Sequence, residues 1–541
     1  MKKNKKVALT ATALSLSAIL AACGGEEEKS ATSSSTDDAE KVLDLLITSE
    51  PPSLHPQLAT DTTSGAILEN TFEGLTTMKD GEPVLAAADD YVVSEDLLTY
   101  TFTLRDAQWS NGEKVTAQDF EYAWKWALNP ENASEYSTIL YPIKGAEAYN
   151  NAKGTAEEVG VKAIDEKTLE VTLNAPTPYF LELTAFKTFF PIHKATAEAN
   201  PKWYTEADSY VGNGAFTLAT WNHSGDIVLE KSETYWDAEN VALETVNVAM
   251  VESETTQMTM FDAGEIDFLG APYGTIALDA IERLKSEDKL QVSDLSGIYW
   301  YKFNTKDPVM QNENIRKALA LSIDREALIS NIVKGEQQPA LGIVPNSVEG
   351  FGDDEGYFKD ADIEEAKKYL DAGLKELGLA SAADLEVKVS YNTSEAHSAI
   401  AQFIQQGWTS NLGISVKLDN AEWQVYLDKI QAGDFQVGRL GWAADYNDAY
   451  SFLEMYNLPT NGNNQTGWSN EEYTKILEAS TTETDAAKRT ELLLQAEEII
   501  MDDMPVAPVY YQTNLFIKSD DVENMAPDAL GNINLKFVDV K

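Results

Sequence analysis

The chain has 541 residues, of which 43% are hydrophobic, and its 89 acidic and 41 basic side chains give a formal net charge of −48. This length allows about three or four domains, and the composition supplies enough apolar side chains for large cores. So negative a surface repels nucleic acid and anionic lipid headgroups, and we expect no nucleic-acid partner. The single cysteine excludes a disulfide framework within the chain.

The N-terminus has the pattern of an export signal. Four lysines among the first six residues precede a mostly apolar run at 7–20, which is too short for a stable membrane span. Residues 20–24, Leu-Ala-Ala-Cys-Gly, resemble a bacterial lipoprotein signal, which implies a mature chain that begins at a diacylglycerol-modified Cys23. Two acyl chains suffice for stable anchoring. Residues 24–40 are polar and lack aromatics, which predicts a flexible tether.

The next segments predict two lobes. A strand is expected at 42–48, and prolines at 51, 52 and 56 hold the following chain extended before a helix at 64–72. Residues 73–194 predict a separate lobe, with an alternating strand at 99–104. A capping box at Thr116 and Asp119 opens a helix there, and we interpret its aromatic stripe, which includes Phe120 and Trp124, as core rather than a sugar-stacking platform.

From 195 to 296 the chain is expected to return to the first lobe. Strands are predicted at 226–230 and 246–251, and Gly264 ends a helix at 255–263. A third lobe follows, in which a strand at 385–391, a helix at 395–411 and a strand from 414 form a βαβ unit with parallel strands. A final strand at 506–517 leads back to the first lobe, so crossings near 296 and 512 would form a hinge.

Residues 433–452 contain the most informative pattern in the chain. Phe435 and Val437 alternate as in a half-buried strand, and Gly438 allows close backbone approach. Arg439, Trp442 and Asp445 then follow at intervals of three. A zwitterionic ligand needs an acid and a guanidinium, because a buried ion left unpaired costs several kcal/mol. The alternative is that Asp445, like most acids of so acidic a chain, is a solvated surface group.

Residues 438–447, Gly-Arg-Leu-Gly-Trp-Ala-Ala-Asp-Tyr-Asn, resemble the ligand-site segment of the oligopeptide-binding proteins, the extracytoplasmic receptors of peptide ABC importers. Further motifs of that family occur in the same order, at 109–112, 115–120, 212–216, 235–237, 304–305, 392–394 and 508–511. The similarity covers the chain from about Leu43 to its end. It implies an α/β fold like that of periplasmic binding proteins, two-lobed with an extra third domain, mixed sheets and a hinge of two crossing segments.

The expected domain boundaries combine these patterns with the resemblance. They are a signal peptide at 1–22, a tether at 23–41, domain I at 42–72, 195–296 and 513–541, domain II at 73–194, and domain III, the ligand-binding lobe, at 297–512. In the family, main-chain pairing supplies affinity while alternate side chains enter separate pockets. Thr60, Asp61 and Thr62 would pair with one side of a bound peptide, and Gly441 and Ala443 with the other.

The resemblance also implies the remaining ligand-contacting residues. They are Tyr136, Trp300, Lys302, His397, Trp423, Leu427, Arg439, Trp442 and Asp445. Asp445 is expected to hold the peptide α-ammonium, and His397 or Arg439 the far carboxylate. Lys302 stands where a well-known member has Glu, so it would favour an acidic side chain or a nearby C-terminus. Read alone, residues 60–62 would be a polar loop, His397 a surface or capping residue and Lys302 a solvated cation whose stem covers apolar surface.

The usual sequence signatures of several other functions are missing from the chain. The chain has no His-Glu-x-x-His, Gly-x-Ser-x-Gly or phosphate-binding Gly-x4-Gly-Lys motif, so we expect no enzyme, and four histidines argue against a metal site or other cofactor. Related receptors bind oligosaccharides, nickel complexes or haem, and peptide-pheromone sensing, adhesin and chaperone roles also stay open. We expect a monomer on the outer face of the cell membrane, anchored at Cys23, that delivers oligopeptides to permease subunits with separate ATPase subunits.

Overall fold

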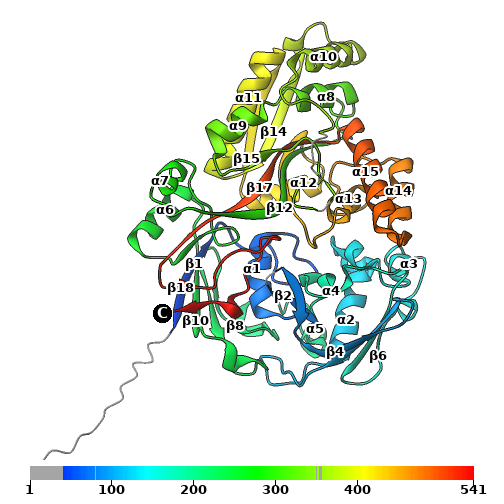
Figure 1. Ribbon diagram of the computed structural model, residues 1–541, viewed down its shortest axis with the longest axis vertical. Helices are drawn as coiled ribbons and strands as arrows, with labels where there is room; N and C mark the ends of the chain where they lie inside the picture. Colours follow the sequence, from blue (N-terminus) through cyan, green and yellow to red (C-terminus); the bar gives the residue numbers. More distant parts are fainter. Residues whose placement is uncertain (1–40, 80, 349, 352–355) are drawn as a thin grey trace, which may run out of the picture. The chain divides into compact units, whose positions relative to one another are not determined.

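The computed structural model describes residues 41–79, 81–348, 350–351 and 356–541 (Figure 1). The export signal, Cys23 and the tether up to residue 40 lie outside these residues. The described chain has a mixed α/β fold built on a four-stranded sheet, a second four-stranded sheet, a seven-stranded sheet and two small two-stranded sheets. The domain boundaries stay predictions.

The first sheet joins the start of the described chain to a segment about 200 residues later. Its order is β1 (Val42–Ile47), β10 (Thr245–Met250), β9 (Asp226–Lys231) and β8 (Phe216–Asn222). β1 runs parallel to β10, with Leu45 opposite Val248, and the other pairs are antiparallel. The predicted strands at 42–48, 226–230 and 246–251 are confirmed.

The second sheet carries the helix that the capping box predicted. Its order is β4 (Ala88–Val93), β5 (Thr99–Leu104), β7 (Thr168–Thr172) and β6 (Val161–Ala163). Helix α2 (Ala117–Leu128) begins after Thr116, whose side chain and backbone both bond Asp119. Phe120 and Trp124 are fully buried. The interpretation of the aromatic stripe as core is therefore confirmed.

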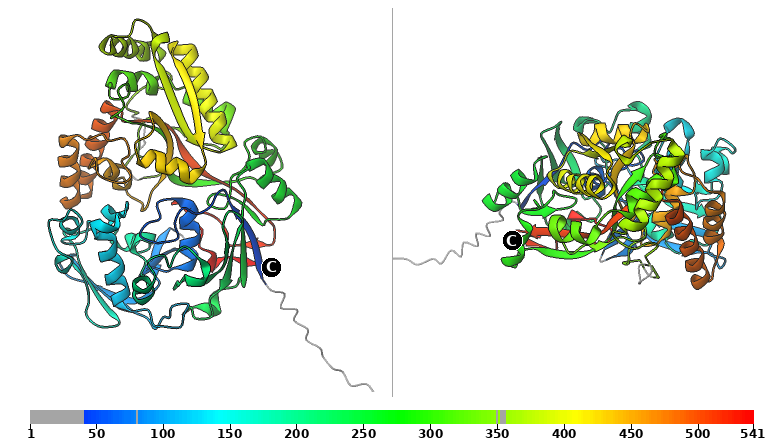
Figure 2. Two further views of the ribbon diagram at one scale, coloured as in Figure 1. Left: turned by 180° about the vertical axis from the view of Figure 1, so that it is seen from behind. Right: turned by 90° about the horizontal axis from the view of Figure 1, so that it is seen from above.

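The seven-stranded sheet contains the two longest strands. Its order is β11 (Phe268–Gly270), β17 (Val506–Lys518), β12 (Gln291–Phe303), β16 (Val437–Ala443), β14 (Glu386–Asn392) and β15 (Ser415–Ala421), and β13 (Gln338–Pro339) also pairs with β17. β12 and β17 run antiparallel side by side (Figure 2), with an irregularity between Asp294 and Ile298. These strands pass the positions, near 296 and 512, where the crossings were predicted. β14 and β15 are parallel and flank α11 (Glu395–Leu412), as the βαβ pattern predicted.

Helix α1 begins earlier than predicted. It covers Thr62–Thr71 because Asp61, in an extended conformation, caps it by accepting from the Ser64 amide at 3.0 Å and the Ser64 hydroxyl at 2.7 Å. Thr62 is therefore helical, and the prediction that it continues an extended segment is wrong. The chain is extended at Asp61, immediately before it.

The remaining elements complete the layers. The two-stranded sheets are β2 (Thr76–Lys79) with β3 (Glu82–Leu85), and β18 (Val522–Glu523) with β19 (Asp539–Val540). The other α-helices are α3 (Ala146–Asn150), α4 (Phe180–Leu183), α5 (Lys194–Ala199), α6 (Glu254–Ala263), α7 (Ile281–Ser286), α8 (Glu313–Leu321), α9 (Arg325–Leu328), α10 (Ile363–Leu377), α12 (Trp423–Gln431), α13 (Tyr450–Leu453), α14 (Glu471–Thr482) and α15 (Ala486–Asp503). Gly264 ends α6 at φ 72°, as predicted.

The buried side chains form two large cores and one small one. One large core joins β1, α1 and the second sheet, the other lies around the seven-stranded sheet, and the small one includes Leu46, Ile281 and Ile517. Trp442 and Tyr450 are half-buried and pack against both large cores. The segment that the sequence singled out therefore lies where the two large cores meet.

At the N-terminal ends of α6 and α11, a glutamate of each helix accepts hydrogen bonds from the other. The Glu254 carboxylate, on α6, accepts from the Ala396 amide at 3.1 Å and from the Ser394 hydroxyl. Glu395, on α11, accepts in return from the Thr255 hydroxyl at 2.7 Å and the Thr255 amide at 3.3 Å. Each carboxylate thus satisfies the free amide end of the other helix.

Candidate functional site

Strand β16 has a backbone edge that is paired over only part of its length. It pairs with β12 from Val437 to Ala443, but with β14 only at Val437 and Gly438. The amide after the strand, that of Ala444, donates to the Ser296 carbonyl on the β12 side. Because successive residues of a strand direct their amides to opposite sides, those of Ala443 and Gly441 point away from β12. The end of β16 thus offers an edge to which an extended chain could pair.

Asp445 follows β16 and is held in place from both sides. Its side chain accepts from the Tyr136 hydroxyl at 3.4 Å, and its amide donates to the Ser451 hydroxyl at 3.0 Å. Burial raises the pKa of Asp445 to about 7, although the nearby Lys187 ammonium and the Tyr136 hydroxyl act to lower it. Because burial destabilises the Asp445 carboxylate, a cationic group bound beside it would stabilise its ionised form.

Lys187 is a buried cation that the sequence analysis missed. It is 7% exposed, and its ammonium lies 4.0 Å from the centre of the Phe186 ring and 5.2 Å from that of Tyr136. Burial lowers the pKa of Lys187, and the charges of Asp445, Glu69 and Asp61 act to raise it. The available signal was a lone lysine in an aromatic run, Phe-Lys-Thr-Phe-Phe at 186–190.

The 60–62 segment contributes Asp61 to this cluster. Burial raises the pKa of Asp61, while the hydrogen bonds from Ser64, the Lys187 charge and an interaction with the Trp423 indole act to lower it. Trp423 and Leu427 are half-buried and lie one turn apart on α12. Asp61 is thus occupied as a helix cap, Thr60 is half-buried beside it, and Thr62 is exposed.

Arg439 lies in a second cluster, which has no acidic side chain. Its guanidinium donates to the Asn392 side chain at 3.1 Å and lies 4.6 Å from the centre of the Tyr299 ring, which stacks on Tyr510. Among the described residues Arg439 forms no salt bridge, and its Nε is buried without a hydrogen-bond partner. The Tyr299 hydroxyl lies 3.4 Å from Nδ1 of His397. The Arg439 guanidinium could therefore pair with a carboxylate of a ligand.

His397 is neutral in this setting. Burial and the Arg439 charge hold the pKa of His397 well below its usual value. Its side chain is half-buried at the N-terminal end of α11, where its amide donates to the Ser394 hydroxyl at 3.1 Å. The alternative of a surface or capping histidine stays open, since the half-buried residue lies in the first turn of α11. Of the two predicted carboxylate partners, His397 is uncharged near neutral pH.

Lys302 is buried rather than solvated. It is 2% exposed, and its ammonium donates to the Asn463 carbonyl at 2.6 Å and the Gln465 side chain at 2.9 Å. Burial lowers the pKa of Lys302 to about 7. The alternative of a solvated lysine that covers apolar surface is wrong, since this amine is enclosed by carbonyl oxygens.

Several buried donors around β12 and β16 have no partner in the described part of the chain. They are Nε1 of Trp300, the hydroxyl groups of Tyr301 and Tyr456, Nε of Arg439 and Nε1 of Trp442. Trp442 stacks on Tyr136, with ring centres 6.2 Å apart. Buried donors are normally paired. Trp300 and Trp442 lie on one face of the sheet and Tyr301 and Arg439 on the other, so a ligand on either face would meet only part of this set.

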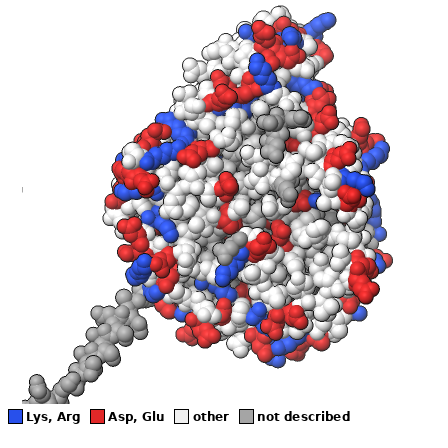
Figure 3. All heavy atoms as spheres, viewed as in Figure 1, with Lys and Arg blue, Asp and Glu red and all other residues white. Residues whose placement is uncertain are grey.

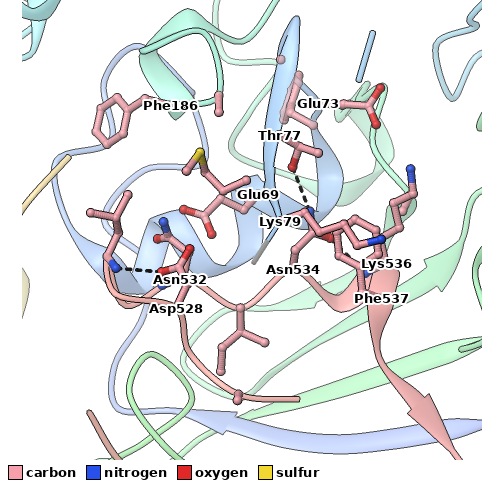
Figure 4. Close-up of a pocket in the computed structure, with 18 of the residues that line it drawn as sticks. Glu69, Glu73, Thr77, Lys79, Phe186, Asp528, Asn532, Asn534, Lys536 and Phe537 are labelled. Carbon is pink, nitrogen blue, oxygen red and sulfur yellow. Dashed lines mark hydrogen bonds between the residues drawn. The ribbon is translucent and has the colours of Figure 1, made fainter. Parts of the chain in front are cut away.

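Asp445 is one of the residues that line a cavity of about 620 Å³. Figure 4 shows this cavity. Its wall is formed by α1, β2, the segment around Phe186, the C-terminal segment 524–537 and Asp445 itself.

The searched residues contain no group of three or more His, Cys, Asp or Glu side chains suited to a metal ion. No described helix is long and apolar enough to span a membrane. Acidic and basic side chains are interspersed on the face seen in Figure 3.

Comparison with known proteins identifies the family. The model of the bacterial extracellular solute-binding proteins, family 5, middle region, matches residues 82–464. The chain belongs to this family. It is 48% identical to the oligopeptide-binding protein OppA of Bacillus subtilis over 98% of both chains. The family binds solutes rather than transforming them, as the sequence predicted.

Two solved structures of family 5 relatives differ in how well they match. Listeria monocytogenes OppA bound to peptide has a TM-score of 0.86 at 31% identity, over 93% of this chain and 99% of that one. The unliganded open form of the murein tripeptide-binding protein MppA has a TM-score of only 0.61 at 30% identity, over 93% and 98%. The described arrangement is thus more similar to the peptide-bound relative than to the open one.

Proposed function

We propose that this family 5 protein captures oligopeptides in an extended conformation and delivers them to an ABC importer. The observation that carries this proposal is the unpaired edge of β16, which has Arg439 at one end and Asp445 just beyond the other. Main-chain pairing along the edge would bind any peptide sequence, and the two charged groups would recognise its ends. The unpaired donors on β16 itself, Nε of Arg439 and Nε1 of Trp442, would meet oxygen acceptors of the peptide. The relatives described as peptide-binding support the same ligand class.

The roles of the charged residues follow from their surroundings. Asp445 would hold the α-ammonium, because burial already destabilises its charge and a cation would relieve that cost. Arg439 would take the peptide carboxylate at lengths that reach it, with neutral His397 beside it as a hydrogen-bonding partner. Lys302 would accept a carboxylate only in place of the Gln465 side chain that it now contacts.

Native mass spectrometry of the purified protein tests the ligand class. We expect peptides of mixed sequence to copurify with the wild type and to be depleted from Asp445→Ala. Since the expected contacts are to main chain and ends, the peptides should share no side-chain motif at most positions. A copurifying oligosaccharide, nickel complex or haem in place of peptides contradicts the proposal.

The anchor and the partners are also part of the proposal. Cys23 would carry the lipid that keeps the receptor at the outer face of the membrane, near permease subunits whose ATPase subunits are other chains. We expect Cys23→Ser to remain unprocessed or to be shed into the medium, because it lacks the acylated thiol. Membrane fractions washed with salt provide the measurement. Equal retention of wild type and variant contradicts the lipid anchor.

A further inference from the structure

The cavity beyond Asp445 continues the proposed peptide site. Asp445 lines the cavity and also ends the segment that carries the free edge of β16. A peptide whose α-ammonium meets Asp445 therefore has its first residue beside the wall of this cavity of about 620 Å³. Phe72, Met78 and Phe186 supply apolar parts of the wall. The space suits a long side chain with an apolar stem.

Glu69 is the cavity's unpaired carboxyl. It projects from α1 into the space (Figure 4), and among the described residues it makes no hydrogen bond or salt bridge. The other carboxyls on the wall have partners. The Glu73 side chain accepts from Nε1 of Trp236 at 2.8 Å, and Asp528 accepts from the Asn532 amide at 2.9 Å.

The remaining wall carboxyl, Glu182, is paired as well. It accepts from the Asn447 amide at 3.0 Å. With Asp445 bonded to Tyr136, each acidic side chain on the described wall except Glu69 therefore has a hydrogen-bond partner. Glu69 is consequently the acid that a ligand could pair without displacing a protein contact.

The lysines on the wall are already engaged. Lys536 forms a salt bridge of 2.8 Å with Asp237, and the Lys518 ammonium donates to the Val522 carbonyl at 3.0 Å. Lys79 lies over the Phe537 ring, 5.0 Å from its centre. The cation that does act on Glu69 is Lys187, and its field is shared with Asp445 and Asp61. One lysine thus faces three carboxyls.

A ligand would change this balance of charge. The α-ammonium of a peptide supplies one positive charge at Asp445, and Asp61 is stabilised by its bonds to Ser64. Glu69 then still lacks a counter-ion. On the basis of the proposed function, we propose that Glu69 selects peptides whose first residue is Lys or Arg, with the side chain passing Phe186 into the cavity to pair with the Glu69 carboxylate.

This pairing would be linked to a proton. Burial and the Asp528 charge raise the pKa of Glu69 to about 8, and Lys187 opposes that shift. Tyr273 is a further titratable group that interacts with Glu69, and Asp445 acts on the same Lys187. Below pH 8 the free carboxyl is mostly protonated, so pairing with a cation must release that proton. The preference for a basic first residue should therefore rise with pH between 6 and 8, by at most about tenfold per unit, and flatten above.

The test uses two peptides that differ only in having lysine or norleucine at position one. Calorimetry on the wild type should show a lysine preference of about tenfold or more at pH 8, since a buried charge pair is gained. Glu69→Gln should lose that preference and keep the wild-type affinity for the norleucine peptide, which also shows that the variant is folded. Glu182→Gln is the matched control, because its carboxyl lines the same cavity but is already paired, and it should keep the preference.

The outcomes separate this inference from the proposed function. If the wild type binds both peptides equally, or if Glu69→Gln keeps the full preference, Glu69 does not select the first residue. The peptide-binding proposal survives in both of those cases. If the wild type binds neither peptide, the proposed function itself fails. A lysine preference that falls as pH rises from 6 to 8 contradicts the coupling to Glu69.

Discussion

Lys302 is a buried amine whose partners are carbonyl oxygens rather than an acid. Its folded pKa of about 7 lies below the unfolded value near 10.4, so between these values the unfolded chain binds a proton that the folded chain does not. Its contribution to the unfolding free energy must therefore rise with pH across that window. We expect the stability of the wild type relative to Lys302→Met to increase from pH 7 to pH 9, by at most about 1.4 kcal/mol per unit.

Denaturant unfolding of both proteins at several pH values measures this difference. The other lysines and tyrosines titrate in both chains, so their effects cancel in the comparison. A difference that stays flat, or that falls as pH rises, means that Lys302 is charged in the folded protein at pH 9.

At the level of single residues, the charged groups of the site could be predicted only where they stand in a regular local pattern among apolar residues. Asp445 and Arg439 stood at regular spacing in an apolar frame, and the structure places each in a buried cluster. Lys187 went unnoticed because its neighbours read as ordinary core, and its role depends on Asp445, more than 250 residues away in the chain. Thr62 was misassigned because Asp61 pairs with Ser64, which starts the helix two residues early.

At the scale of single elements, the proposed peptide binding depends on the free edge of β16. Since alternate amides of this strand point away from β12, a paired peptide would use every second one of its own amides. We expect N-methylation of the peptide to weaken binding at alternate positions, by about 1–3 kcal/mol where a hydrogen bond is lost, and to have little effect between them. Calorimetry on a set of singly N-methylated peptides gives the pattern. Equal losses at all positions, or none, contradict strand pairing.

Local patterns predicted the elements they control. The capping box at Thr116, the stop at Gly264 and the alternation at 99–104 each depend on side chains within a few residues, so the sequence sufficed. No strand was predicted at 291–303, the whole of β12. From Ser296 to Phe303 that strand is buried on both faces, so alternation does not mark it there. The point where β14 leaves β16, which creates the free edge, depends on long-range pairing that no local pattern encodes.

At the scale of the whole molecule, the site requires residues from both large cores to meet. Tyr136, Asp61 and Lys187 come from the first part of the chain, and Asp445 and Arg439 from the second. We therefore expect ligand to drive closure about the paired strands β12 and β17. Small-angle scattering should show a smaller radius of gyration when a tight peptide is added. An unchanged radius at saturation means that the site lies within one lobe or that the lobes are already closed.

The hydrogen bonds between the N-terminal ends of α6 and α11 allow a second test of this closure, with one variant and one control. Glu395→Gln keeps the shape of the side chain but weakens its bonds to Ser253 and Thr255, which bind a charged acceptor more strongly than a neutral one. We expect the variant to need more peptide for the same compaction. Glu386→Gln, at an exposed position on β14, is the control and should behave as wild type. If Glu395→Gln needs no more peptide than the wild type, the hydrogen bonds between α6 and α11 do not stabilise the closed form.

The contact between Asp445 and the peptide α-ammonium is the central claim, and a two-by-two calorimetric set tests it most directly. Wild type and Asp445→Ala are each titrated with one peptide in its free and N-acetylated forms. Removing one partner of a buried charge pair costs about 2–5 kcal/mol, so either change alone should weaken binding by roughly 30-fold to several thousand-fold. Acetylation should add little in the variant, because the contact is already gone. If the two losses simply add, Asp445 does not hold the N-terminus and the account is contradicted.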